Sequence, residues 1–140
     1  MDDSLQNERD FLTALELGKL LDDHRGIDVV VMDMRSLGFW TDFFVIATVM
    51  SNTHLSGLER HIKEFVRENG LEILRRSSKP EKGDEWHLLD LGEIVIHLMT
   101  AATRSFFELE RLWSAAPLIY QGNKGNTEPD LSEAYSSKSS

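Results

Sequence analysis

The segment from Glu85 to Trp113 reads EWHLLDLGEIVIHLMTAATRSFFELERLW and decides the fold, because it specifies two strands, a tight turn and a helix in succession. Trp86 to Leu91 and Ile94 to Met99 are rich in β-forming residues, and only Gly92 and Glu93 separate them. This spacing predicts an antiparallel hairpin. Gly92 is expected to supply the positive φ that the turn needs.

The residues after the hairpin predict a short helix. Ser105 and Glu108 stand at capping-box spacing, so the helix is expected to begin at Ser105. Pro117 cannot continue a helix, and the helix is expected to stop before it. The side chains that this helix would carry include Leu109, Glu110, Leu112 and Trp113.

Toward the N-terminus, apolar residues predict two further helices and three further strands. Helical spacing is found from about Gln6 to His24 and again from Leu55 to Val66. The runs IDVVVM at 27–32 and FFVIATV at 43–49 are typical of strands buried on both faces, and Leu71 to Leu74 predicts a short strand. With the hairpin, these elements predict a mixed α/β fold in which helices pack on a sheet of about five strands.

The second of these helices, Leu55 to Val66, is amphipathic. Its apolar residues occupy one side, and charged residues such as Glu59 fall mostly on the other. Thr53, or Ser51 together with Asn52, is expected to cap its N-terminus.

Changes in composition predict the boundaries of the folded unit. Residues 1–10 are acidic and expected to fray, and residues 11–120 are expected to form one domain. Residues 121–140 are rich in serine and poor in apolar side chains, so a disordered tail is predicted. Arg75 to Asp84 mixes basic and acidic side chains and is expected to be a solvated polar loop.

Charge and cysteine content limit the classes of function. The chain has 140 residues, 24 acidic and 15 basic, with a formal net charge of -9, so phosphate backbones should repel it. A basic protein is therefore a better partner than RNA. The absence of cysteine excludes disulfides and thiolate chemistry. No signal peptide, transit peptide or apolar run of roughly 20 residues is evident, so a cytoplasmic protein without a membrane anchor is expected.

Two blocks of sequence resemble a known family. The first is TDFFVIAT at 41–48, followed by Ser51, Asn52 and His54. The second comprises Trp86, Asp90, Gly92, His97, Arg104, Phe107, Leu109, Glu110, Leu112 and Trp113. Over roughly Leu12 to Trp113 the chain resembles the ribosomal silencing factor family, also called the Iojap or DUF143 family. It departs from the family at Val49, where glycine is usual, and at Phe107, where tyrosine is usual.

The resemblance implies a nucleotidyltransferase-like fold without its catalytic carboxylates, and a protein that acts by binding. It would dock on protein fourteen of the large ribosomal subunit, prevent the small subunit from joining, and lower translation when nutrients are scarce. The implied partner-binding residues are Trp86, Asp90, Met99, Arg104, Phe107, Leu109 and Glu110. Three residues, His97, Leu112 and Trp113, are expected to support that surface. Family members also form homodimers, which would compete for the same surface, and no cofactor or metal is expected.

The alternatives are a metal-dependent nucleotide enzyme and a homodimeric scaffold. An enzyme of that fold needs two carboxylates two residues apart on one strand face. Asp33 is followed by Met34 and Arg35, and Asp90 by Leu91 and Gly92, so neither strand end offers the pair. We therefore expect no enzymatic activity.

Histidine chemistry is also disfavoured. His54 and His61 are seven residues apart and lack a third neighbouring ligand in the sequence, so they predict no zinc site. A triad of Ser51, His54 and Asp42 lacks the sharp nucleophile turn that such sites use. Packing or surface roles are the simpler interpretation of these histidines and of His87.

Three polar or aromatic residues of the hairpin segment have open roles. Trp86 is compatible with ordinary packing or with a binding hot spot, and the resemblance favours binding. His97 lies between apolar residues and is expected to brace Asp90 or a neighbouring backbone carbonyl. Arg104 is expected to pair with Glu108 or Asp90, or to reach the partner.

Overall fold

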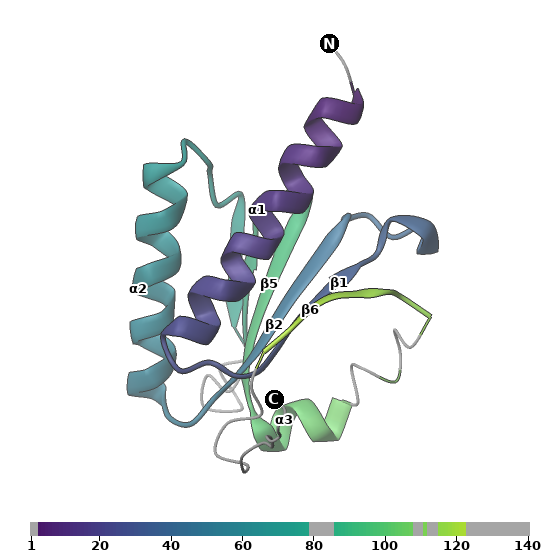
Figure 1. Ribbon diagram of the computed structural model, residues 1–140. Coiled ribbons are helices and arrows are strands. Elements are labelled where there is room, and N and C mark those ends of the chain that lie inside the picture. Colours follow the sequence, from purple (N-terminus) through teal and green to yellow (C-terminus); the bar gives the residue numbers. More distant parts are fainter. Residues whose placement is uncertain (1–2, 79–85, 108–110, 112–114, 123–140) are drawn as a thin grey trace, which may run out of the picture.

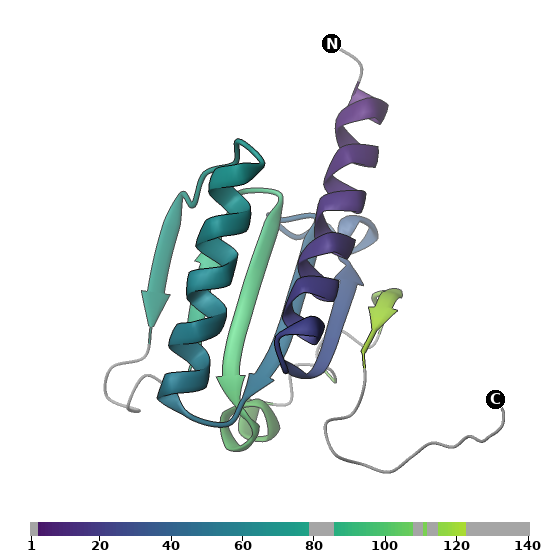
Figure 2. The same cartoon turned by 60° about the vertical axis from the view of Figure 1, so that its left-hand side comes forward.

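The computed structural model describes residues 3–78, 86–107, 111 and 115–122. In these residues, six strands form one mixed sheet. The strand order is β3-β4-β5-β2-β1-β6. Two long helices, α1 (Asp3–Asp23) and α2 (Asn52–Glu68), lie side by side on one face of this sheet (Figures 1 and 2). The strands are β1 (Ile27–Asp33), β2 (Phe43–Val49), β3 (Arg75–Ser78), β4 (Trp86–Asp90), β5 (Ile94–Thr100) and β6 (Leu118–Gln121).

The predicted hairpin is confirmed. β4 pairs antiparallel with β5, with Trp86 opposite Met99, and Gly92 has a φ of 102° in the turn. β5 then pairs in parallel with β2 along its whole length, from Phe43 opposite Ile94 onward. This parallel pair is central in the sheet, which explains why both strands are almost fully buried.

Apolar side chains form two separate cores, one on each face of the sheet. The first lies between the sheet and the two long helices, and includes Leu17 of α1 and Leu58 of α2. The second lies on the opposite face and contains Phe44, Ile46, Val95 and Met99, with Trp86 and Leu88 packed against it. The predicted mixed α/β fold is therefore confirmed.

Two boundaries upstream of the hairpin differ from prediction. The third strand was predicted at Leu71–Leu74, but it is formed by Arg75–Ser78, part of the segment predicted as a loop. The strand lies at the sheet edge, where only one side needs a partner and polar residues are favoured. α1 begins at Asp3, so residues 3–10, predicted to fray, belong to the helix. The domain boundaries themselves stay a prediction.

Two elements after the hairpin were also misplaced or missed. α3 (Ala101–Phe107) begins at Ala101 and not at Ser105, because the Thr100 hydroxyl accepts the Thr103 amide at 3.3 Å and caps its first turn. β6 was not predicted. It pairs with β1, and it is short and half-exposed, so its four residues show no apolar alternation.

No helix in the described residues has the length and apolarity needed to cross a membrane.

Candidate protein-binding site

A row of aromatic rings crosses the face of the sheet that α1 and α2 leave uncovered. Trp86 on β4 lies 6.0 Å from His97 on β5, measured between ring centroids. His97 in turn lies 4.7 Å from Phe44 on β2 in an edge-to-face contact, and Phe44 lies 6.1 Å from Phe39. We call Trp86, His97, Phe44 and Phe39 the aromatic row. Its two ends, Trp86 and Phe39, are partly or largely exposed, and its middle is buried.

Trp86 is held in place by a hydrogen bond to His97. The indole Nε1 donates to His97 Nδ1 at 3.3 Å. Burial lowers the pKa of His97 to about 4, so the imidazole is neutral near pH 7. Acceptance of this bond at Nδ1 places the single ring proton on Nε2. Of the two partners expected for His97, Asp90 is not one, because His97 Nδ1 accepts from Trp86 and the Asp90 carboxylate contacts Gly92 and Arg75. A bond to a neighbouring backbone carbonyl stays a prediction.

Asp90 serves the turn between β4 and β5. Its carboxylate accepts the Gly92 amide at 2.8 Å and pairs with Arg75 at 3.2 Å. The residue is buried, and these two contacts orient the hairpin end. A direct contact between Asp90 and a partner stays a prediction.

Met99 and Arg104 are buried as well. Met99 lies in the second core, and Arg104 donates to the Thr48 hydroxyl at 2.9 Å, which ties α3 to the end of β2. Of the three roles expected for Arg104, pairing with Asp90 is not found, because the Asp90 carboxylate contacts Gly92 and Arg75. Glu108 lies outside the described residues, so that pairing and a contact with the partner stay predictions. Of the predicted partner-binding set, Trp86 is the member whose side chain is described and reaches the surface. Outside the described side chains lie Phe107, Leu109, Glu110, Leu112 and Trp113.

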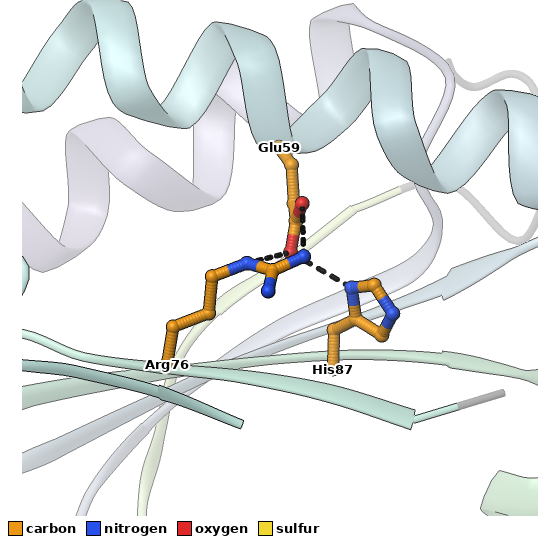
Figure 3. A network of polar contacts seen from close by, with 3 residues as sticks. All are labelled: Glu59, Arg76 and His87. Carbon is orange, nitrogen blue, oxygen red and sulfur yellow. Dashed lines mark hydrogen bonds and ion pairs between the residues drawn. The ribbon is translucent and has the colours of Figure 1, made fainter. Parts of the chain in front are cut away.

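A partly buried charged network joins α2 to β3 and β4, on the face of the sheet covered by α2 (Figure 3). Glu59 of α2 accepts two hydrogen bonds from the Arg76 guanidinium, at 3.0 and 3.1 Å, and lies 2.8 Å from His87 Nδ1. His87 is the direct neighbour of Trp86 in β4. The network therefore connects α2 to the strand that carries Trp86.

Electrostatics keep Glu59 ionised in this network. Burial alone would raise the pKa of Glu59, but the hydrogen bonds from Arg76 and His87 outweigh it and hold the pKa below its usual value. The prediction that Glu59 faces away from the core is wrong. The signal was present, because Glu59 follows Leu55 by four residues and precedes Ile62 by three, inside the apolar stripe.

The residues weighed for catalysis have structural roles in the described part of the chain. Ser51 Oγ accepts the His54 amide at 3.1 Å and caps α2, as predicted, and His54 Nδ1 accepts the Met50 amide. Asp33 binds the Arg35 guanidinium at 2.7 Å. The described residues include no group of three His, Cys, Asp or Glu side chains placed to hold a metal ion.

Comparisons with known proteins identify the family. Residues 6–140 match the family model described as ribosomal silencing factor during starvation. A ribosomal silencing factor of Treponema pallidum is 37% identical over 100 residues, covering 71% of this chain and 88% of the relative. Its counterpart in Bacillus subtilis is 36% identical over 99 residues, covering 69% and 80%. A crystal structure from Bacillus halodurans superposes with a TM-score of 0.62 at 29% identity, covering 76% of this chain and 95% of the other. The chain therefore belongs to the ribosomal silencing factor family.

Proposed function

We propose that this protein docks on protein fourteen of the large ribosomal subunit through the Trp86 end of the aromatic row. Bound there, it would block the small subunit sterically and lower translation when nutrients are scarce. The observation that carries the proposal is Trp86 itself. This chain belongs to the ribosomal silencing factor family, and its Trp86 is held at the surface by a hydrogen bond to the buried, neutral His97.

A tryptophan presented in this way suits an interface. The bond to His97 restricts the indole before binding, so little side-chain entropy is lost when a partner covers the ring. Tryptophan is also enriched among the few residues that contribute most of the binding energy at protein interfaces. Binding alone is sufficient for a steric block, so the proposal requires no catalytic group.

The net charge supports a basic protein as the partner. At -9, the chain is attracted to basic protein surfaces and repelled by exposed ribosomal RNA. Attraction speeds correct encounters, and repulsion disfavours wrong sites on the same subunit. This is the balance expected of a factor that must find one protein on an RNA-rich particle.

Cosedimentation with isolated large subunits tests the docking surface. Trp86→Ala should weaken binding at least tenfold, about 1.4 kcal/mol, and Trp86→Phe, which keeps an apolar ring but loses the Nε1 donor, should fall between it and the wild type. The matched control is Leu12→Ala, an exposed apolar residue on α1, on the opposite side of the sheet. Equal binding by Trp86→Ala and Leu12→Ala, with unchanged melting temperatures, would refute this surface.

The steric block is tested separately by subunit joining. Purified subunits are mixed with increasing amounts of the protein, and light scattering follows formation of the joined ribosome. We expect the wild type to reduce the amplitude and Trp86→Ala to require at least about tenfold more protein for the same reduction. If the protein binds large subunits tightly and subunit joining is not reduced, the steric block is refuted and only ribosome binding remains.

A further inference from the structure

Exposed apolar side chains gather at the end of the sheet opposite α3. Trp40 is 62% exposed, Leu74 is 60% exposed and Phe39 is 43% exposed. All three lie in connections that lead into strands, Phe39 and Trp40 before β2 and Leu74 before β3. We call these three residues the Trp40 rim. An exposed tryptophan with exposed apolar neighbours is a typical mark of a contact surface.

Hydrogen bonds hold the Trp40 rim around the turn between β4 and β5. The Thr41 hydroxyl donates to the Gly92 carbonyl at 3.1 Å, directly beside Trp40. On the other side, the Leu74 amide donates to the Asp90 carbonyl at 2.7 Å. β3 and β2 are three strand spacings apart, so the rim spans roughly 14 Å. A protein segment of about four extended residues, at about 3.4 Å each, covers this distance.

The same end of the sheet carries an excess of negative charge. Asp33 is paired with Arg35, but Asp42 and Asp10 add two carboxylates nearby. Burial, followed by the charges of Asp10 and Asp33, raises the pKa of Asp42 despite the opposing effect of Arg35. One oxygen of Asp10, Oδ2, is buried and has no hydrogen-bond partner. A cationic side chain brought to this end would therefore be stabilised, and a phosphate would be repelled.

We propose that the Trp40 rim is a second contact surface for the large subunit, and that it takes a protein segment with a lysine or arginine beside apolar side chains. This inference rests on the proposed function. The aromatic row runs from Trp86 to Phe39 in the rim across one face of the sheet, so Trp86 and Phe39 lie on the same face, with the buried His97 and Phe44 between them. Two anchors on one partner give more affinity than either alone, because the second binds without a further loss of translational freedom.

Cosedimentation with large subunits tests the rim, with Trp40→Ala, Leu74→Ala and Asp42→Asn compared with the wild type. Trp40→Ala should weaken binding at least about tenfold, and Leu74→Ala and Asp42→Asn about two- to fivefold each. The matched control is Leu118→Ala, since Leu118 is 48% exposed and lies on β6, the opposite edge of the sheet from β3. It should bind within about twofold of the wild type. Melting temperatures check that all variants are folded.

The results separate the inference from the proposed function. If Trp40→Ala binds like Leu118→Ala while Trp86→Ala is weakened, the rim is overturned and the Trp86 surface stands. If the wild type does not bind large subunits at all, both are overturned. A parallel measurement uses protein-free ribosomal RNA. If Trp40→Ala weakens binding to that RNA as strongly as to the subunit, the partner is nucleic acid and the protein segment proposed here is wrong.

Discussion

Replacing Glu59 by alanine should destabilise the protein more than any other single charge removal on α2. The carboxylate accepts from Arg76 twice and contacts His87 at 2.8 Å, and it is buried between α2 and β4. Without it, two donors lose their acceptor at once. The two donors differ in how easily water can replace that acceptor, and this difference sets how much unfolding free energy is lost.

Arg76 has a side chain that is 43% exposed, so its guanidinium can turn to water and its share of the loss is small. His87 has a side chain that is only 9% exposed, and its Nε2 is already buried without a partner. Leaving a buried donor unsatisfied costs about 1–3 kcal/mol, and breaking a buried ion pair costs about 3–5 kcal/mol before solvent screening. Because Arg76 is half-exposed, we expect Glu59→Ala to lower the free energy of unfolding by about 3 kcal/mol in total.

Urea unfolding followed by circular dichroism measures this change at pH 7. Glu59→Gln keeps the shape and loses only the charge, so it should cost about half as much. The control is Glu64→Ala, since Glu64 is 47% exposed and lies 3.8 Å from His61, and it should stay within about 0.5 kcal/mol of the wild type. A loss below about 1 kcal/mol for Glu59→Ala would refute the reasoning.

The pH dependence gives a second check with a defined sign. The pKa of Glu59 is lower in the folded protein than its ordinary value of 4.5. The stability from its charge is therefore present in full above pH 4.5 and is lost as the pH falls through the folded pKa. The difference between the wild type and Glu59→Gln should shrink below that pH. A constant difference down to pH 3 would show that the charge contributes nothing.

Two further groups have predicted titrations. Burial lowers the pKa of His97 to about 4. By NMR, its imidazole chemical shifts should therefore not change between pH 8 and pH 5.5. A titration midpoint near the ordinary value of 6.5 would contradict its burial. Since the folded pKa is depressed, its neutral form adds stability that is full above pH 6.5 and falls toward pH 4. Burial and the hydrogen bond to Asp22 at 2.7 Å raise the pKa of Tyr120 to about 12. Ultraviolet absorbance should therefore show ionisation of Tyr120 only near that pH. Tyr120→Phe should cost about 1 kcal/mol in urea unfolding, and no cost would mean that this bond does not hold β6.

Local patterns predicted the elements whose residues carry their own signal. The β4–β5 hairpin follows from two β-rich runs and Gly92, whose φ of 102° few other residues adopt. α2 follows from its apolar stripe and from Ser51 as its cap. These signals lie within a few residues of each other, so no distant part of the chain is needed to interpret them.

Elements that depend on a distant partner were missed. β3 is polar and becomes a strand because β4 pairs with it and Arg76 meets Glu59 across the core. β6 becomes a strand because β1 pairs with it and Tyr120 binds Asp22, 98 residues earlier in the chain. Neither segment has an alternating apolar pattern that would predict a strand by itself.

The sequence by itself determined the α/β class, the central hairpin, the resemblance to the family and Trp86 as a residue of interest. Only the tertiary structure decided what surrounds that residue. It brought His97 within hydrogen-bond distance of the indole, and it placed Glu59 of α2 against His87, the neighbour of Trp86 in β4. It also buried Asp90, Met99 and Arg104, which the family motif had suggested for binding. The physical reason is that exposure and hydrogen-bond partners depend on which strands and helices pack together, and a motif records only the order of residues along the chain.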